Sequence, residues 1–560
     1  MRTAVDARSS SAKILKEKME NKKYFAVMLD CSRNAVTTVN GVKKFADIIS
    51  SLGYNALMLY TEDTYEIAGE PLFGYMRGRY SKSELREIDD YCFSKGIELI
   101  PCIQTLAHLR QIFQHPTYWD AHDLEDILKV GAPRTYELIE KMFATCRECF
   151  RSDRINIGMD EAHMLGLGHY LDENGYKNRF ELFCEHLKKV LAISYKYKYK
   201  PMMWSDMFFA SANNARYYTE NGYLPESYKK IVPENVSLVY WDYYSEKKEK
   251  YENIISQHRA LGNELWFAGG AWKWNSFSVS NKVAMRRTKE AFKACEECGI
   301  DNVIVTVWGG GGGGDEAPLY SVLPSLYYIA GLKNGVSDLS EAEKGFNEKF
   351  GENFSDFMLL DLDLGKRIPR FSETLGGVRA MLYCDPFLGR FDSAVWEDGR
   401  EERAWKRLSK KLFAAEKRSK NYGYIFKTYG ELCAIMSVKH GLGVKTRKAY
   451  SERNYEELKK LAGVYSRLAR SVEKFAETFY LCWTKERKPQ GFEVQQARLG
   501  GLALRLKHCA KRIKNFVLGN ADKIEELEEK TVDCLDGSDK FTKKIIDYNN
   551  YLYSFTTNVY

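Results

Sequence analysis

No stretch of about 20 apolar residues occurs anywhere in this 560-residue sequence, so no membrane-spanning helix is predicted. Residues 1–20, MRTAVDARSSSAKILKEKME, lack the apolar core and the small-residue cleavage site of an export signal. The 13 cysteines are an odd number spread over a long chain, a pattern typical of reduced thiols rather than of a disulfide framework. These absences predict a cytoplasmic protein with no membrane partner.

A concentration of charge of one sign is also missing. The net charge is +8, which is small for this length, and basic and acidic residues alternate along much of the chain. A polyanion would favour a concentrated basic face, so no nucleic-acid partner is predicted. Aromatic residues, by contrast, are plentiful at 14%, including 37 Tyr and 10 Trp. Flat rings of this kind fill a large core, and they also pack against the faces of sugar rings.

The letters DEAH at residues 160–163 spell a motif that names a class of RNA helicases. Such an enzyme requires a phosphate-binding loop of the form GxxxxGK[ST]. The one Gly-Lys pair, at 365–366, is followed by arginine and lacks the upstream glycine. The glycine tract 309–314 contains no lysine and is followed by two acidic residues, which would repel phosphate. The sequence therefore argues against a helicase.

Short apolar runs recur through the first 310 residues, separated by helix-like amphipathic segments such as 81–96 and 281–299. Continuous apolar runs are typical of strands buried on both faces, as in parallel sheets. The eight runs cover residues 24–30, 55–60, 97–103, 154–160, 201–206, 236–242, 263–270 and 301–308. Eight strands alternating with helices in about 300 residues predict a (β/α)8 TIM barrel. A doubly wound open sheet is disfavoured because no Gly-rich turn follows the first strand.

The texture changes after about residue 335. Long segments such as 401–420 and 455–483 have helical periodicity and few β-branched runs, which predicts an α-helical C-terminal domain. We therefore expect an N-terminal lead-in at 1–22, a catalytic barrel at 23–335 and a helical domain at 336–560. Two CxxC pairs, Cys146/Cys149 and Cys295/Cys298, suggest zinc at first sight. They precede the fourth and eighth strands, on opposite sides of such a barrel, so no metal site is predicted.

Polar and aromatic residues fall at every predicted strand end. In a barrel of this kind the carboxyl ends of the strands meet at one rim, where the chemistry takes place. Any one of these residues has an ordinary structural explanation, as a helix cap, a solvated charge or a core side chain. Eight consecutive strand ends in agreement predict a sugar site, with aromatic walls for ring faces and charged groups for hydroxyls. The residues are Asp30, Arg33, Asp63, His108, Asp160, Glu161, Trp204, Trp241, Tyr243, Tyr244, Trp272, Trp274, Trp308, Asp315 and Glu316.

The ordered motifs LDCSRNAV (29–36), IQTLAHL (103–109), NIGMDEAH (156–163) and WSDM (204–207), followed by WDYY and the strand-eight Trp-Gly, resemble glycoside hydrolase family 20. This is the family of β-N-acetylhexosaminidases, and more specifically the residues look like the branch with a catalytic barrel and a helical C-terminal extension. The resemblance covers about residues 24–335. It implies substrate-assisted, retaining hydrolysis, an exception to the usual two-carboxylate scheme of glycosidases.

The resemblance assigns catalytic roles to three residues. Glu161 would be the general acid that protonates the leaving oxygen and later the base toward water. Asp160 would hold the N–H of the substrate's 2-acetamido group while its carbonyl oxygen attacks the anomeric carbon. A tyrosine after the sixth strand would donate to the acetamide oxygen, and we prefer Tyr243 over Tyr244. Burial and the charge of Asp160 are expected to keep Glu161 protonated.

The same resemblance implies binding roles around the sugar. Arg33 would grip the 3- and 4-hydroxyls, and His108, paired with Asp63, would support the acid. Glu316 would bind the 4- and 6-hydroxyls, although only glycine follows the strand-eight Trp-Gly here, and Asp315 is the alternative. Preference between gluco and galacto sugars stays open. Three tryptophans would box the acetamide and the ring face, namely Trp204, Trp274 and Trp308.

The expected function is therefore that of an exo-acting β-N-acetylhexosaminidase, releasing terminal GlcNAc or GalNAc from an oligosaccharide or glycoconjugate. No metal or organic cofactor is implied, and a homodimer is one assembly open to the chain. The alternative is a non-catalytic sugar-binding protein on the same barrel. The presence of Asp160, Glu161 and a donor tyrosine argues against it.

Overall fold

A closed barrel of eight parallel strands in sequential order forms the first part of the molecule, in a computed structural model that describes residues 22–214, 216–310, 314–364, 377–396, 398–532 and 555. The predicted (β/α)8 barrel is confirmed, and each strand overlaps one of the eight apolar runs. The strands are β1 (Phe25–Asp30), β2 (Ala56–Tyr60), β3 (Glu98–Cys102), β4 (Arg154–Asn156), β5 (Lys200–Trp204), β6 (Ser237–Trp241), β7 (Leu265–Gly270) and β8 (Val303–Val307).

The strands are apolar throughout because both of their faces are buried. In β1, Ala26 and Met28 belong to the cluster that fills the barrel interior, whereas Val27 and Leu29 pack outward against the helices. Trp204 and Tyr60, at the carboxyl ends of β5 and β2, belong to this interior cluster, and Trp241 and Trp308 pack against it. Aromatic side chains therefore occupy the barrel interior where the strands end at the rim.

Helices follow the strands and cover the barrel. Local signals explain their ends: in α3, Ser81 and Glu84 form a capping box at the start, and Gly96, with φ +72°, follows the end. The predicted helices at 81–96 and 281–299 correspond to α3 and α10. The covering helices are α2 (Val39–Ser51), α3 (Lys82–Ser94), α4 (Pro133–Cys149), α6 (Arg179–Lys196), α7 (Asp206–Ala212), α9 (Lys248–Arg259), α10 (Asn281–Glu297) and α11 (Leu323–Lys333).

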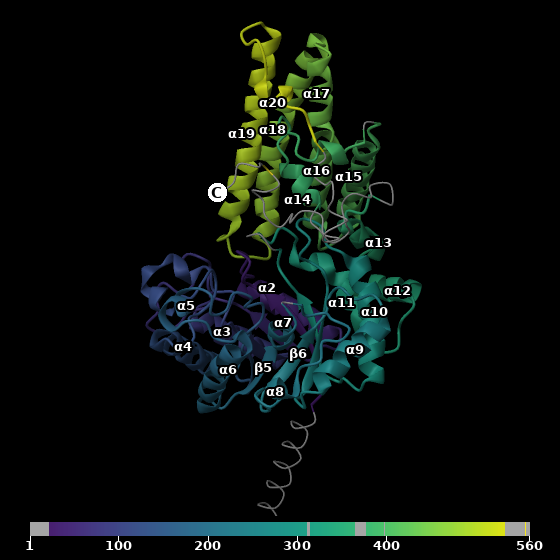
Figure 1. Ribbon diagram of the computed structural model, residues 1–560. Helices are drawn as coiled ribbons and strands as arrows, with labels where there is room; N and C mark the ends of the chain where they lie inside the picture. Colours follow the sequence, from purple (N-terminus) through teal and green to yellow (C-terminus); the bar gives the residue numbers. More distant parts are fainter. Residues whose placement is uncertain are drawn as a thin grey trace, which may run out of the picture.

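A bundle of long helices stands on one end of the barrel (Figure 1). This confirms the predicted helical C-terminal region, while its exact limits remain a prediction. Helix α12 (Leu339–Phe350) packs on α11, so the passage from barrel to bundle is gradual. The main helices of the bundle are α14 (Gly377–Tyr383), α15 (Arg400–Arg418), α16 (Gly423–Lys439), α17 (Leu442–Ser451), α18 (Tyr455–Trp483) and α19 (Phe492–Val517).

The structure also shows where the CxxC cysteines lie and whether any helix could cross a membrane. Cys146 and Cys149 lie at the end of α4, and Cys295 lies at the end of α10; all three are buried, as is usual for structural thiols. Within the ranges given above, no helix combines the length and apolarity needed to cross a bilayer.

Candidate active site

A pocket of about 190 Å³ opens at the carboxyl ends of the barrel strands. It contains every residue to which the family resemblance gives a role except Asp63 and Glu316 with its alternative Asp315. Of the other predicted strand-end residues it contains Trp241 but not Asp30 or Trp272, and Gly309 is an addition. A larger hollow of about 760 Å³ lies among α15 to α18, but lysines, glutamates and aliphatic side chains dominate its lining. The rim pocket gathers acids and aromatic rings, so we place the site there. Its lining comprises Arg33, His108, Asp160, Glu161, Trp204, Trp241, Tyr243, Tyr244, Trp274, Trp308 and Gly309.

Asp160 is a buried anion in the pocket wall. Its Oδ1 accepts a hydrogen bond from Gln104 Nε2 at 2.7 Å, and its Oδ2 lies 3.3 Å from His108 Nε2 as an ion pair. Burial opposes the ionisation of Asp160, but His108 and the Gln104 hydrogen bond outweigh it and lower the pKa of the carboxyl. Burial also lowers the pKa of His108, and the charge of Asp160 overrides this and raises that pKa to about 10. Both groups are therefore charged at neutral pH.

Glu161 stands at the mouth of the same pocket. Its side chain is 48% exposed, and its Oε2 lies 3.7 Å from His108 Nε2. The backbone N–H of Glu161 donates to Asp206 Oδ2 at 2.9 Å. The expected burial of Glu161 is not found, because the turn after β4 directs this side chain toward solvent. The adjacent acids thus occupy different surroundings, one enclosed and one open.

The backbone between β4 and Glu161 explains this division. Met159 and Glu161 have φ of +74° and +52°, which non-glycine residues rarely adopt. Gly158, with φ +73°, passes so close to Gln104 that a Cβ atom would lie 2.1 Å from Gln104 Oε1. Such conformations cost about 1–3 kcal/mol each and cluster at functional sites. The strained turn directs neighbouring side chains to different sides.

Aromatic rings form the opposite wall. Tyr243 is buried, and its hydroxyl accepts a hydrogen bond from Trp308 Nε1 at 2.8 Å. The Tyr243 ring stacks on Trp241 with 5.4 Å between centroids and meets Trp274 edge-on at 5.2 Å. Tyr244 is 52% exposed and lies at the rim. Of the two tyrosines, Tyr243 is the one whose hydroxyl is held inside the wall.

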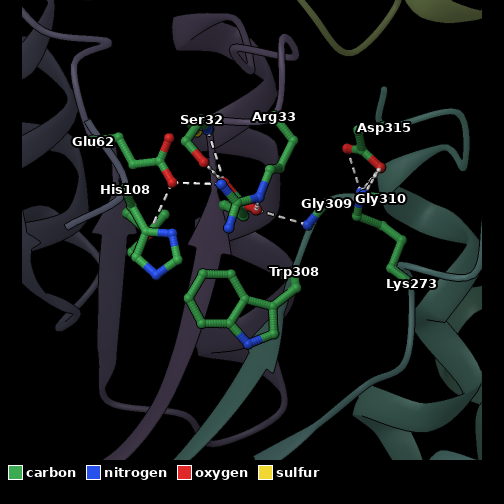
Figure 2. Close-up of polar contacts among 12 residues, drawn as sticks. Ser32, Arg33, Glu62, His108, Lys273, Trp308, Gly309, Gly310 and Asp315 are labelled. Atoms are coloured by element: carbon green, nitrogen blue, oxygen red, sulfur yellow. Dashed lines mark hydrogen bonds and ion pairs between the residues drawn. The ribbon is translucent and has the colours of Figure 1, made fainter. Parts of the chain in front are cut away.

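Arg33 lies at the other end of the pocket, between Glu62 and Gly309 and above Trp308 (Figure 2). Its Nη1 donates to Glu62 Oε1 at 2.5 Å, and its Nε lies 3.8 Å from Asp30 Oδ2. Although burial disfavours the cation, Glu62 and Asp30 outweigh it, and the pKa of Arg33 stays well above its ordinary value. Asp30 Oδ2 also accepts from the N–H of Gly309 at 2.8 Å. Arg33 is thus a fixed cation beside the strand-eight loop.

The predicted pairing of His108 with Asp63 is wrong. Asp63 accepts a hydrogen bond from Arg77 Nε at 3.0 Å and is buried away from the pocket. Besides Asp160 and Glu161, the carboxylate that approaches His108 is Asp126, with 3.9 Å between its Oδ2 and His108 Nδ1. The strand-two loop directs Glu62 to the site and Asp63 to Arg77, a difference that adjacent acidic residues do not reveal.

The expectation that Glu316 faces the sugar is also not met. Glu316 is fully buried and accepts from Arg379 through both oxygens, at 2.9 Å to Nε and 2.6 Å to Nη2. The alternative, Asp315, is buried as well and is bound by Lys273 (Figure 2) and Arg487. Both acids are therefore paired with cations, and among the described residues of 309–316 it is Gly309 that lines the pocket.

The family resemblance gave no role to Asp206, Trp241 or Glu62, although Trp241 was among the predicted strand-end residues. Asp206 begins α7 within the WSDM motif, and its Oδ1 accepts from Trp241 Nε1 at 3.1 Å. Burial and the nearby charge of Asp160 raise the pKa of Asp206 to about 8. The position of Asp206 at a strand end was a usable signal, whereas the pairing of Glu62 with Arg33 depends on the folded loops.

One cluster among the described residues has the composition of a metal site. Potential ligand atoms of His108, Asp160 and Glu161 lie within 4.8 Å of one another. A metal requires a neutral imidazole, and the pKa of His108, raised to about 10 by Asp160, keeps the ring protonated at neutral pH. The cluster therefore fits an ion pair better than a metal centre.

Comparisons with known proteins agree with this architecture. Residues 23–297 match the glycosyl hydrolase family 20 catalytic domain, and residues 356–546 match the glycoside hydrolase 20C C-terminal domain. Hexosaminidase D of Homo sapiens is 24% identical over 263 residues, which are 43% of this chain and 49% of that protein. A β-hexosaminidase of Akkermansia muciniphila is 22% identical over 166 residues, 24% of this chain and 34% of that protein. The chain thus spans about half or less of these relatives.

Solved structures similar to this chain include an exo-β-N-acetylglucosaminidase of Vibrio harveyi. It is 15% identical with a TM-score of 0.45, and the match covers 61% of this chain and 58% of the other. A β-N-acetylhexosaminidase of Bacteroides fragilis is 17% identical with a TM-score of 0.43, covering 55% and 65%. The two family models together match most of the sequence, and the match to the catalytic domain precedes the match to the C-terminal domain, as expected. The chain belongs to glycosyl hydrolase family 20.

Proposed function

We propose that this chain is an exo-acting β-N-acetylhexosaminidase that hydrolyses terminal β-linked GlcNAc or GalNAc with retention of configuration. The observation that carries the proposal is the contrast between Asp160 and Glu161. Asp160 is buried and held as an anion by His108, whereas Glu161 is half exposed at the mouth of an aromatic pocket. An enclosed anion suits a cationic intermediate, and an open acid suits a leaving group that departs into solvent.

In the first step, Glu161 donates its proton to the glycosidic oxygen as the bond to the anomeric carbon breaks. The carbonyl oxygen of the 2-acetamido group forms the new bond to that carbon, giving an oxazolinium ion. Asp160 accepts the hydrogen bond of the acetamide N–H and stabilises the positive charge. Because the acetamide and the leaving oxygen are on neighbouring sugar carbons, adjacent residues suit these two tasks.

In the second step, Glu161, now a carboxylate, takes a proton from water, whose oxygen attacks the anomeric carbon. The oxazolinium ring opens, the acetamide is restored, and two inversions yield net retention. Tyr243, held by Trp308, would donate its hydroxyl proton to the acetamide oxygen. Arg33 would bind hydroxyls at the far end of the ring, with Trp204, Trp274 and Trp308 around the sugar.

The size of the pocket supports action on a terminal sugar. Its volume of about 190 Å³ is below the ~300–1,000 Å³ of pockets for drug-sized ligands. Space on this scale accommodates one sugar unit rather than a chain crossing the site. The preference between GlcNAc and GalNAc stays open, because the loop that the resemblance assigns to the 4-hydroxyl contributes a glycine to the pocket.

Hydrolysis of an N-acetyl-β-glucosaminyl disaccharide and of an aryl β-N-acetylglucosaminide with a good leaving group tests the proposal. Glu161→Gln should slow the disaccharide by about 10²–10⁴-fold and the aryl substrate far less, because only the poor leaving group needs the proton. A thiazoline that mimics the oxazolinium ion should bind tightly to the wild-type protein. Glu173→Gln, an exposed acid on α5 (His169–Asn174), is the matched control and should change neither rate.

Three outcomes would contradict all or part of the proposal. Wild-type rates in both Asp160→Asn and Glu161→Gln would show that the chemistry lies elsewhere. Sugar binding without turnover in the wild-type protein would favour a non-catalytic sugar-binding protein. Absence of thiazoline binding alongside normal turnover would remove the substrate-assisted step while leaving the hydrolase.

A further inference from the structure

The turn between α18 and α19, residues 484–491, reaches from the helical bundle onto the rim of the barrel. Figure 1 shows the lower ends of these two helices meeting the N-terminal part of the barrel. Residues 486–488 of this turn run alongside residues 36–38, which follow β1. The N–H of Lys488 donates to Val36 O at 2.8 Å, and the N–H of Thr38 donates to Glu486 O at 3.0 Å. The 484–491 turn is therefore paired, backbone to backbone, with the loop that carries Arg33.

A glycine brings the same turn still closer to Arg33. Gly491 has φ +94°, and a Cβ atom there would lie 1.7 Å from the carbonyl oxygen of Asn34. Only glycine permits both the backbone conformation and this approach. The residue after Arg33 is thus in direct contact with the start of α19.

Arg487 connects this turn to the strand-eight loop. Its Nη1 donates to Asp315 O at 2.6 Å, and its Nη2 donates to Asp315 Oδ2 at 2.9 Å and to the carbonyl of Ala317. The Arg487 side chain is 4% exposed. A planar fork that reaches three acceptors holds a loop in one orientation, which a single point charge does not.

Asp315 transmits this contact to the pocket. Its Oδ1 accepts from Lys273 Nζ at 2.5 Å and from the N–H of Gly310 at 3.3 Å. Gly310 follows Gly309, which lines the pocket and whose position next to Arg33 leaves no room for a side chain. One turn of the helical bundle therefore supports both loops at the Arg33 end of the pocket.

We propose that Arg487 is a positioning residue for substrate binding, through which the helical bundle holds the Arg33 and Gly309 loops in register. The proposal rests on the proposed function, because it assigns this end of the pocket to the sugar hydroxyls. Arg487 touches neither Asp160 nor Glu161, so its loss misplaces the binding end and leaves the reacting end intact. This proposal gives the helical bundle a role in substrate binding.

Steady-state kinetics of Arg487→Ala on an aryl β-N-acetylglucosaminide test the proposal. A displacement of about 1 Å costs up to about 100-fold, so kcat/KM should fall by about 10–100-fold. Most of the fall should be in KM, because binding to the hydroxyls is lost equally from the ground and transition states. Arg487→Lys, which keeps the charge but not the fork, should give an intermediate KM, and it serves if the alanine variant does not fold.

Arg505→Ala is the matched control. Arg505 is an α19 arginine that binds buried Asp385 at 2.6 Å, a pair contained within the helical bundle. It should lower stability without changing KM. In the double variant Arg33→Gln/Arg487→Ala, the fold-decrease in kcat/KM should be smaller than the product of the two single fold-decreases. The difference should exceed about threefold, because both residues act on the same end of the pocket. Full multiplicativity, or the same KM in Arg487→Ala as in Arg505→Ala, would overturn the proposal.

Hydrogen exchange separates this proposal from the proposed function, because it needs no turnover. Peptides covering residues 29–37 and 303–310 should exchange faster in Arg487→Ala than in wild type, and should be unchanged in Arg505→Ala. If the wild-type protein hydrolyses no N-acetylhexosaminide, the proposed function fails and exchange still decides the positioning role. If turnover is normal while exchange and KM are unaffected by Arg487→Ala, the positioning role fails alone.

Discussion

Replacing His108 with glutamine removes the cation that keeps Asp160 ionised in its buried setting. The pKa of His108, raised from 6.5 to about 10 by Asp160 against the effect of burial, corresponds to roughly 5 kcal/mol at about 1.4 kcal/mol per pH unit. Removing one partner of a buried pair costs about 3–5 kcal/mol, because the other charge is left without compensation. We therefore expect His108→Gln to lower the free energy of unfolding by about 3–5 kcal/mol, and the midpoint of thermal unfolding by roughly 6–10 °C.

The pH dependence gives this prediction its sign. The pKa of His108, raised by Asp160, is higher in the folded than in the unfolded protein, so its contribution to stability is complete below pH 6.5 and is lost as pH rises through about 10. Calorimetry should therefore show the largest difference between wild type and His108→Gln near pH 6, shrinking toward pH 10. In kinetics, the acid limb of kcat/KM should move to higher pH in the variant, because burial raises the pKa of Asp160 once His108 no longer opposes it.

His186→Gln is the control for this experiment. His186 is also fully buried, and its Nε2 lies 2.8 Å from the carbonyl oxygen of Thr105, but burial lowers its pKa to about 4. Its replacement should cost stability without any change in that cost between pH 6.5 and 10. A stability difference for His108→Gln that stays constant over the same range would refute the ion-pair reasoning.

Two further changes probe the remaining walls of the site. Burial and the charge of Asp160 raise the pKa of Asp206 to about 8, so the folded wild-type protein loses stability as pH rises from about 4 to about 8. Asp206→Asn removes this ionisable group, so the free energy of unfolding should fall less over the same pH range. Thermal unfolding at both ends of the range measures this, and equal slopes in both proteins would contradict it. Tyr243→Phe removes the hydroxyl that we propose donates to the acetamide, and it should lower kcat for an aryl β-N-acetylglucosaminide by about 10²–10³-fold. An unchanged kcat would show that Tyr243 only packs beside Trp308.

The fold could be predicted because its signals are local. Continuous apolar runs such as 24–30 or 301–308 identify a buried strand without knowledge of its neighbours. Helix limits such as Ser81 and Gly96 depend on hydrogen bonds and backbone conformation within a few residues. Once eight strands alternate with helices, barrel closure brings their carboxyl ends together, so Asp160, Trp204 and Trp308 were predicted to meet.

The parts of the site that were missed depend on distant contacts. Nothing near Glu316 indicates that Arg379 binds both of its oxygens, since that arginine lies 63 residues further on. Arg487 reaches Asp315 across 172 residues. Asp63 and Glu62 are neighbours with the same charge, yet one binds Arg77 and the other binds Arg33. In each case the partner of the acidic residue depends on the direction that its side chain takes in the folded protein.

The sequence by itself determined the barrel, the helical region that follows it, and the adjacency of Asp160 and Glu161, because periodicity and chain order are local properties. The tertiary structure alone decided which acid is enclosed and which is exposed, since this depends on the strained turn after β4 and on His108. It also decided that the helical bundle supports the Arg33 end of the pocket through Arg487. The electrostatic environment of a carboxylate depends on all the groups around it, and folding brings those groups from distant parts of the chain.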